Sequence, residues 1–188
     1  MYSNLINKLK EKNINLKNGL DNNELSKVES VYNVKFPIDL KDFYAEVLPV
    51  GEGFYNWRDF SKINVNNIKR VLDRPFQNVK EDISNIVWNE NWGNSPEDSK
   101  EISKCIMRLL EKAPKLIPIY KHRYMASQYN SSNPIFSIYG LDIIYYGENL
   151  EQYFDIELRY KKHSDINYNN IRKIDFWSDI LWILDMFI

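Results

Sequence analysis

The sequence predicts an α+β fold in which a central, mostly antiparallel sheet is flanked by helices. Apolar residues recur at helical spacing before residue 114, short β-branched and aromatic runs follow between residues 115 and 146, and a helical pattern returns after residue 149. With 188 residues the chain has the size of one domain, and no spacer rich in Pro, Gly or Ser divides it. We therefore expect a single domain over residues 1–188.

Two helices are predicted in the first quarter of the chain. Asp21 can cap a helix start, and Glu24, three residues later, can return the bond in a capping box. A second apolar stripe follows Phe36-Pro37 at i, i+3, i+4, i+7 and i+8, and it predicts a helix that Pro49 ends. The stripe consists of Leu40, Phe43, Tyr44, Val47 and Leu48. The aromatic run at residues 54–57 should then be a short strand or the edge of a loop.

A helical insertion is predicted over about residues 66–114. Its first helix should begin near Asn64 and be disrupted at Pro75, because proline lacks the amide that a helix interior needs. A continuation through Ile83 is left open. Its second helix should start at Ser95-Pro96, where serine can cap and proline suits the first turn, and should close at Pro114.

An antiparallel meander of four strands is predicted after residue 115. The runs are rich in β-branched and aromatic residues and are separated by turn residues. They span residues 116–120, 123–126, 134–139 and 143–146. Gly140-Leu141-Asp142 is short enough to join the last two runs as a hairpin.

Helices should follow the strands. Asn149 can cap a helix over residues 150–157, and Asp175 can cap a C-terminal helical extension over about residues 174–188. The hydrophilic stretch between them, residues 159–173, should be a loop.

Charge and composition exclude several classes of protein. The 25 Lys and Arg residues against 26 Asp and Glu residues give a formal net charge of -1, so no general positive field would gather nucleic acid. No stretch approaches the roughly 18 to 20 apolar residues that cross a membrane. A single cysteine and a start without a secretory signal are typical of a cytoplasmic protein. We therefore expect a cytoplasmic protein with neither nucleic acid nor membrane as a direct partner.

The sequence contains no recognisable catalytic, metal-binding or cofactor-binding motif. Of the two histidines, we expect His122 to be structural and His163 to be exposed, whereas Cys105 lies on an apolar helix face as a buried small hydrophobe. No Cys pair, HExxH motif or phosphate-binding glycine loop occurs. We expect no enzymatic activity and no cofactor. A hydrolase that uses paired carboxylates, such as Glu148 and Glu151, is a distant alternative.

The charges are distributed unevenly along the chain. Between Arg123 and Arg159 there is no Lys or Arg, and five acids stand beside eight aromatic residues. The acids are Asp142, Glu148, Glu151, Asp155 and Glu157. From Arg159 to Lys173, five basic residues outweigh the single acid, Asp165, so the surface should be dipolar. The acidic segment is either a Tyr-lined sheet with solvated acids on one face, or a docking face whose acids steer a basic partner.

Residues 133–150, followed by Tyr153-Phe154, resemble the sheet-and-helix signature of the SUKH superfamily, which includes the Smi/Knr-like proteins. The run reads Asn133-Pro134-Ile135-Phe136-Ser137-Ile138-Tyr139-Gly140-Leu141-Asp142-Ile143-Ile144-Tyr145-Tyr146-Gly147-Glu148-Asn149-Leu150. Upstream, residues 25–40 resemble the helical entry of the family, residues 53–57 its aromatic core turn, and residues 116–124 its first long strand. The similarity covers roughly residues 20–158, and its motifs are packing signatures. The insertion and the extension after Arg159 depart from a minimal member.

The resemblance implies a function as well as a SUKH fold. Bacterial members of the superfamily are largely understood as immunity proteins that bind and neutralise polymorphic toxins, often nucleases, whereas fungal relatives regulate cell-wall synthesis. We therefore expect a monomeric immunity protein that docks a cognate toxin stoichiometrically; a regulatory adaptor or scaffold of the Smi/Knr type is the alternative. The candidate partner-binding residues are Glu52, Tyr55, Trp57, Asp142, Glu148, Glu151, Tyr153 and Asp155. For Trp57, a position in the core is the stronger expectation.

Overall fold

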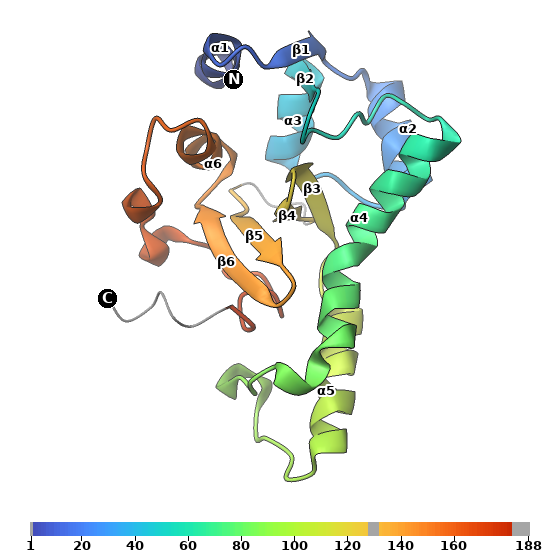
Figure 1. Cartoon of the computed structure of the whole chain (residues 1–188), viewed down its shortest axis with the longest axis vertical. Helices are drawn as coiled ribbons and strands as arrows, with labels where there is room; N and C mark the ends of the chain where they lie inside the picture. Colours follow the sequence, from blue (N-terminus) through green and yellow to red (C-terminus); the bar gives the residue numbers. More distant parts are fainter. Residues whose placement is uncertain (1, 128–131, 182–188) are drawn as a thin grey trace.

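A four-stranded antiparallel meander lies at the centre of the molecule (Figure 1). The computed structural model describes residues 2–127 and 132–181. Its strands are paired in chain order: β3 (Leu116–Tyr120), β4 (Arg123–Ala126), β5 (Ile135–Tyr139) and β6 (Asp142–Gly147). Tyr139 and Asp142 pair across the hairpin turn at Gly140, which adopts a positive φ of 64°. The predicted α+β class, the meander and the hairpin are confirmed.

The N-terminal elements cover one face of this sheet. They are α1 (Ser3–Glu11), β1 (Asn15–Asn18), α2 (Asn22–Tyr32), α3 (Ile38–Glu46) and β2 (Val47–Val50). The prediction that Val47 and Leu48 continue a helix is wrong. These residues form β2, because Lys17 and Asn18 of β1 lie opposite them in an antiparallel pair. The sequence analysis had predicted neither α1 nor β1.

Two predicted helix caps are confirmed. The Asp21 carboxylate accepts a 2.8 Å bond from the Glu24 amide, and Glu24 accepts a 3.0 Å bond from the Asp21 amide, which completes the capping box of α2. Asn149 accepts from the amide of Gln152 at 3.0 Å and begins α6 (Leu150–Glu157). In both cases the side chain satisfies an amide that has no partner within its helix.

The predicted disruption of the helix at Pro75 is wrong, and the continuation that the sequence left open is what the structure shows. α4 (Lys62–Glu81) continues through this residue, which is buried. Proline removes the donor to the carbonyl oxygen of Val71, and the hydroxyl of Tyr124 on β4 lies 3.4 Å from that oxygen and supplies another donor. The missing bond of the helix is thus replaced from the sheet.

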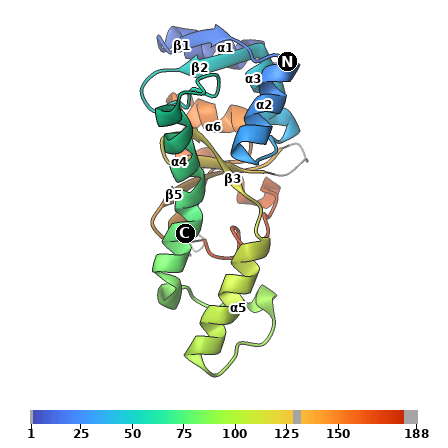
Figure 2. The ribbon, with the colours of Figure 1, turned by 90° about the vertical axis from the view of Figure 1, so that its right-hand side faces the viewer.

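α4 and α5 (Ser99–Lys112) form an arm that extends beyond the sheet (Figure 2). Two short 3₁₀ turns, η1 (Ile83–Asn85) and η2 (Glu90–Trp92), lie between them. The start of α5 was predicted three residues too early. Asp98 is the cap, because its carboxylate accepts from the Glu101 amide at 3.0 Å, and Ser95 lies outside the helix.

The C-terminal segment, residues 174–181, links the arm to the sheet through hydrogen bonds. The carboxylate of Asp179 accepts from the Asn91 amide group at 3.0 Å and from the Trp92 indole at 2.9 Å, and the indole of Trp177 donates to the carbonyl oxygen of Pro114 at 2.8 Å. Residues 175–179 form turns and no helix occurs over residues 174–181, so the predicted helix is wrong there; the rest of it, residues 182–188, lies outside the described residues. Before this segment come η3 (His163–Asp165) and η4 (Tyr168–Asn170).

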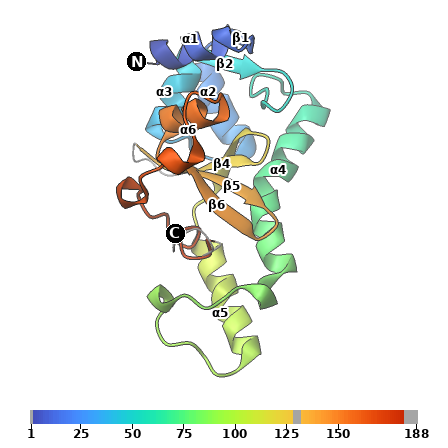
Figure 3. The ribbon, with the colours of Figure 1, turned by 60° about the vertical axis from the view of Figure 1, so that its left-hand side comes forward.

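Both faces of the sheet are buried, each in a separate hydrophobic core. On β3, Ile117 and Ile119 point to the core shared with α1, α2, α3 and α6, whereas Leu116 points to the core shared with α4, α5 and Trp177. Alternate residues of a strand face opposite sides, so a sheet covered on both faces needs apolar residues at successive positions. Figure 3 shows α6 packed between α1 and the strands.

Candidate interaction surface

The turn between β3 and β4, the turn between β5 and β6, and the loop before α4 lie together at one end of the meander. They form a surface, which we call the turn-end surface. It consists of the exposed residues Glu52, Lys121, Tyr139 and Asp142 and the half-buried residues Tyr55 and His122. Backbone hydrogen bonds join the segments. The Lys121 amide donates to the carbonyl oxygen of Gly53 at 2.7 Å, and the Ile138 amide donates to the carbonyl oxygen of His122 at 3.0 Å. The loop and both turns are therefore held as one rigid edge.

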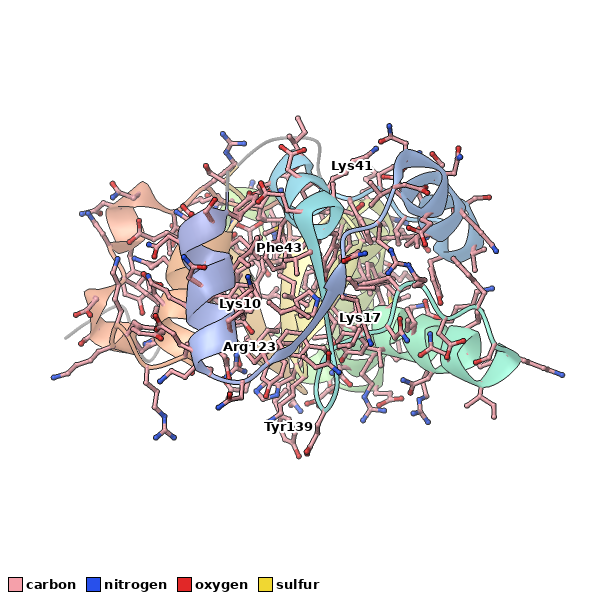
Figure 4. All side chains as sticks on the ribbon, turned by 90° about the horizontal axis from the view of Figure 1, so that it is seen from above. Lys10, Lys17, Lys41, Phe43, Arg123 and Tyr139 are labelled. Carbon is pink, nitrogen blue, oxygen red and sulfur yellow. The ribbon has the colours of Figure 1, made fainter. Side chains whose placement is uncertain are left out.

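Tyr139 is the most prominent side chain of this surface. It is 76% exposed, and Figure 4 shows it projecting outward. Its ring contacts the His122 ring edge-on, with 6.3 Å between centroids. Exposed aromatic side chains on rigid turns are typical contact residues, because they bury a large area at little entropic cost. Tyr139 is not among the residues predicted to bind a partner, although the alternation of strand β5, with Ile138 facing the core, indicates that Tyr139 faces outward.

Two further members of the turn-end surface are constrained by their surroundings. The Tyr55 hydroxyl donates to the Lys121 carbonyl oxygen at 2.5 Å, and burial raises its pKa to about 12, so it remains a donor. His122 is half-buried; burial lowers its pKa, and the charges of Arg123 and Lys121 lower it further. His122 is therefore neutral at pH 7.

Two of the predicted partner-binding residues are not available to a partner. Trp57 is 0% exposed and packs edge-on against Phe36 with 5.2 Å between ring centroids. Tyr153 is also fully buried, beside Phe154, and a Cβ at Gly147 would come within 2.7 Å of it. Both are core residues: the stronger expectation for Trp57, a position in the core, is confirmed, and the ring of Tyr153 is buried where a partner contact was predicted.

Three acids of the predicted acidic face have partners within the chain. Asp155 binds Lys8 at 2.5 Å, and Glu157 faces the Arg123 guanidinium at 3.3 Å. Glu148 accepts from the Asn167 amide at 2.8 Å and from Gln152 at 2.6 Å. These bonds outweigh the effect of burial, and the pKa of Glu148 is lowered.

Of the predicted acidic candidates, Glu52, Asp142 and Glu151 are exposed. Only Glu52 and Asp142 belong to the turn-end surface, whereas Glu151 lies in the first turn of α6, where an acid suits the helix dipole. In the part of the chain that the structure describes, the acids of this segment thus do not form one continuous docking face.

A buried cation braces this end of the sheet. Arg123 is 9% exposed, donates to the Ser137 hydroxyl at 2.8 Å and places its guanidinium 3.7 Å from the centre of the Tyr146 ring. With its ion pair to Glu157, it connects β4, β5, β6 and α6. Since these contacts lie directly behind the turns, they hold the exposed edge in place.

Two expectations about other reactive side chains are also corrected. His163, expected to be exposed, is half-buried, with Nε2 at 2.8 Å from the Tyr145 carbonyl oxygen and its ring 5.3 Å from that of Tyr146. Cys105 is half-buried rather than fully buried.

Within residues 2–127 and 132–181, no group of three or more His, Cys, Asp or Glu side chains is placed to hold a metal ion. In the same part of the chain, no helix has the length and apolar character needed to cross a membrane. No protein-family model, curated protein or solved structure matches this chain.

Proposed function

We propose that this protein is a non-catalytic binding protein, an immunity protein of the SUKH type, that docks a cognate toxin through the turn-end surface. The observation that carries the proposal is the exposed Tyr139 on a rigid edge, with Glu52, Asp142 and Lys121 around it. An aromatic anchor surrounded by charges is the arrangement that protein interfaces use for affinity and for steering. The sequence resemblance supports the SUKH assignment.

The proposed mode of action is stoichiometric. A monomer in the cytoplasm would cover the active site of the toxin or block access to its substrate, and no reaction would be catalysed. The rigidity of the turn-end surface favours this mode, because a surface that is ordered before binding loses little entropy when the complex forms.

Co-expression with the product of a neighbouring toxin gene tests the proposal. We expect a one-to-one complex in size-exclusion chromatography and rescue of growth. Tyr139→Ala should weaken the complex by about 30-fold or more, as for a contact residue that contributes 2 kcal/mol. Tyr168→Ala is the matched control, because Tyr168 is a 40% exposed tyrosine outside the turn-end surface.

Three results would argue against this proposal. The first is failure of every neighbouring gene product to form a complex, and the second is unchanged binding by Tyr139→Ala. The third is capture of regulatory proteins of the host without protection of growth, which would favour the adaptor alternative.

A further inference from the structure

A second exposed cluster lies where the C-terminal end of α1 meets the turn that follows α6. We call it the basic rim: the exposed Lys12, Arg159, Tyr160, Lys161 and Lys162, with the half-buried Lys8 at its inner side. The two segments are far apart in sequence, but α1 packs against α6, and the Lys8 ammonium reaches Asp155 of α6 at 2.5 Å. The fold thus adds the lysines of the first helix to the basic residues that follow α6.

Tyr160 is at the centre of the basic rim. It is 41% exposed, and the ammonium groups of Lys12 and Lys8 lie 4.9 Å and 5.3 Å from the centre of its ring. Its hydroxyl donates to the carboxylate of Glu11. The aromatic side chain is therefore held in a fixed position among cations.

The backbone at Arg159 also points to a use for this cluster. Arg159 follows the end of α6 with a φ of 64°, a left-handed conformation that glycine adopts without a steric cost. The side chain at this strained position is a fully charged one that extends into solvent. The Tyr160 amide donates to the Asp155 carbonyl oxygen at 2.7 Å and closes this turn, so the end of α6 fixes the position of Arg159 beside Tyr160.

The basic rim borders the turn-end surface. Glu157, two residues before Arg159, forms the ion pair with Arg123 that braces the turns. The pKa of Lys121 on the turn-end surface is raised, mainly by Tyr120 and to a smaller extent by the charges of Glu52 and Glu157. A partner that covers the turn-end surface would therefore have the basic rim at its margin.

We propose that the basic rim binds a carboxylate-rich patch on a protein partner. This inference rests on the proposed function, and it gives the toxin a surface charge opposite to the one that the acidic sequence segment had suggested. Carboxylates on the partner would meet Lys12, Arg159 and Lys162, and Tyr160 would supply apolar contact area.

The local charges favour a protein over nucleic acid. Glu11, Asp155 and Asp165 lie among the cations, and these three carboxylates would repel a row of phosphates. The two lysine ammonium groups at the Tyr160 ring also compete with any base that would stack there. Scattered carboxylates on a folded protein can avoid both obstacles.

Fluorescence anisotropy with a labelled peptide whose glutamates are spaced apart by tyrosine and glycine residues, so that its carboxylates are scattered, tests the inference. We expect the peptide to bind the whole protein at low salt and to dissociate as salt rises. The double variant Lys12→Glu with Arg159→Glu should weaken binding by about tenfold or more. The control, Lys17→Glu with Lys41→Glu, changes the net charge equally on β1 and α3 and should retain binding (Figure 4).

The outcomes separate the two proposals. Absence of peptide binding, equal loss in both double variants, or tighter binding of a single-stranded RNA of equal charge through Lys12 and Arg159 would overturn the basic rim as a site for acidic protein surfaces. If those results accompany a stable toxin complex, the proposed function stands without the basic rim. If the peptide binds as expected but no toxin does, the basic rim stands and the toxin assignment fails.

Discussion

Replacing Arg123 with methionine should lower the free energy of unfolding by about 2–3 kcal/mol. Methionine keeps most of the aliphatic stem, so the change removes the cation and leaves little cavity. It therefore tests whether this guanidinium braces the turn-end surface, as its position behind both turns indicates.

The expected loss of stability follows from three contacts that the Arg123 guanidinium makes and from the free energy needed to desolvate it. A hydrogen bond from a charged donor, here to Ser137 at 2.8 Å, contributes about 1.5–3 kcal/mol. The contact with the Tyr146 ring at 3.7 Å contributes up to about 2 kcal/mol where water is excluded. The pair with Glu157 adds to this, because the carboxylate oxygen that faces the guanidinium at 3.3 Å is buried and has no hydrogen bond, although the side chain as a whole is 23% exposed. The desolvation of the guanidinium, which methionine avoids, offsets part of the sum.

Urea unfolding followed by tryptophan fluorescence provides the measurement. Arg123→Met, Glu157→Gln and the double variant form a cycle, and we expect a coupling of about 1 kcal/mol between the two side chains. Arg70→Met is the control, since Arg70 is exposed and should change stability by less than about 0.5 kcal/mol. The bracing role of Arg123 would be refuted if Arg123→Met lost as little stability as the Arg70→Met control. It would also be refuted if Arg123 and Glu157 showed no coupling energy.

Three further predictions concern the backbone and the charges. Arg159→Gly should raise the free energy of unfolding by about 1 kcal/mol, because glycine adopts the left-handed conformation without strain. The same variant should weaken binding of the acidic peptide. A drop in thermal stability would show that the backbone at Arg159 is not strained. Tyr124→Phe should lower the free energy of unfolding in urea by about 1 kcal/mol in the wild type. In the Pro75→Ala background it should lower it little, because the helix amide at residue 75 is restored. An equal loss in both backgrounds would disprove that the Tyr124 hydroxyl replaces the missing bond. The hydrogen bond from Arg58 lowers the pKa of Glu24 to about 2, below its unfolded value of 4.5. The resulting stabilisation is present above the unfolded pKa and is lost as pH falls towards 2, so thermal unfolding of wild type and Glu24→Gln should converge there and differ most near neutral pH.

Features that depend on a few neighbouring residues could be predicted from the sequence. Asp21 and Asn149 cap helices through bonds that span only three residues, and the turn at Gly140 has a length that fits a hairpin. The four strands are also local, since each is a short run of residues with strong preference for extended backbone.

Features that depend on distant segments could not be predicted. Val47 and Leu48 fit a helical stripe, and they become a strand because β1 lies beside them. Pro75 stays inside α4 because a hydroxyl on β4 provides the missing donor. In each case a tertiary contact overrides a correct local preference.

The same reason explains the errors at the candidate surface. The acidic segment seemed free because its partners, Lys8 and Arg123 among them, are distant in sequence or at its margin. Composition cannot distinguish a buried aromatic residue such as Tyr153 from an exposed one such as Tyr139, although the alternation of β5 contains that information.

The bonds of the C-terminal segment to the arm have a consequence for synthesis. Ile174, Phe176 and Trp177 complete the core between the sheet and the arm, whereas the other core uses residues no later than Leu158. As the nascent chain leaves the ribosome, the first core can therefore close while apolar residues such as Leu110 still face water. Until Trp177 emerges, the core between the sheet and the arm stays incomplete while the other core is already packed. Chaperones or aggregation would act on the apolar surface of the incomplete core.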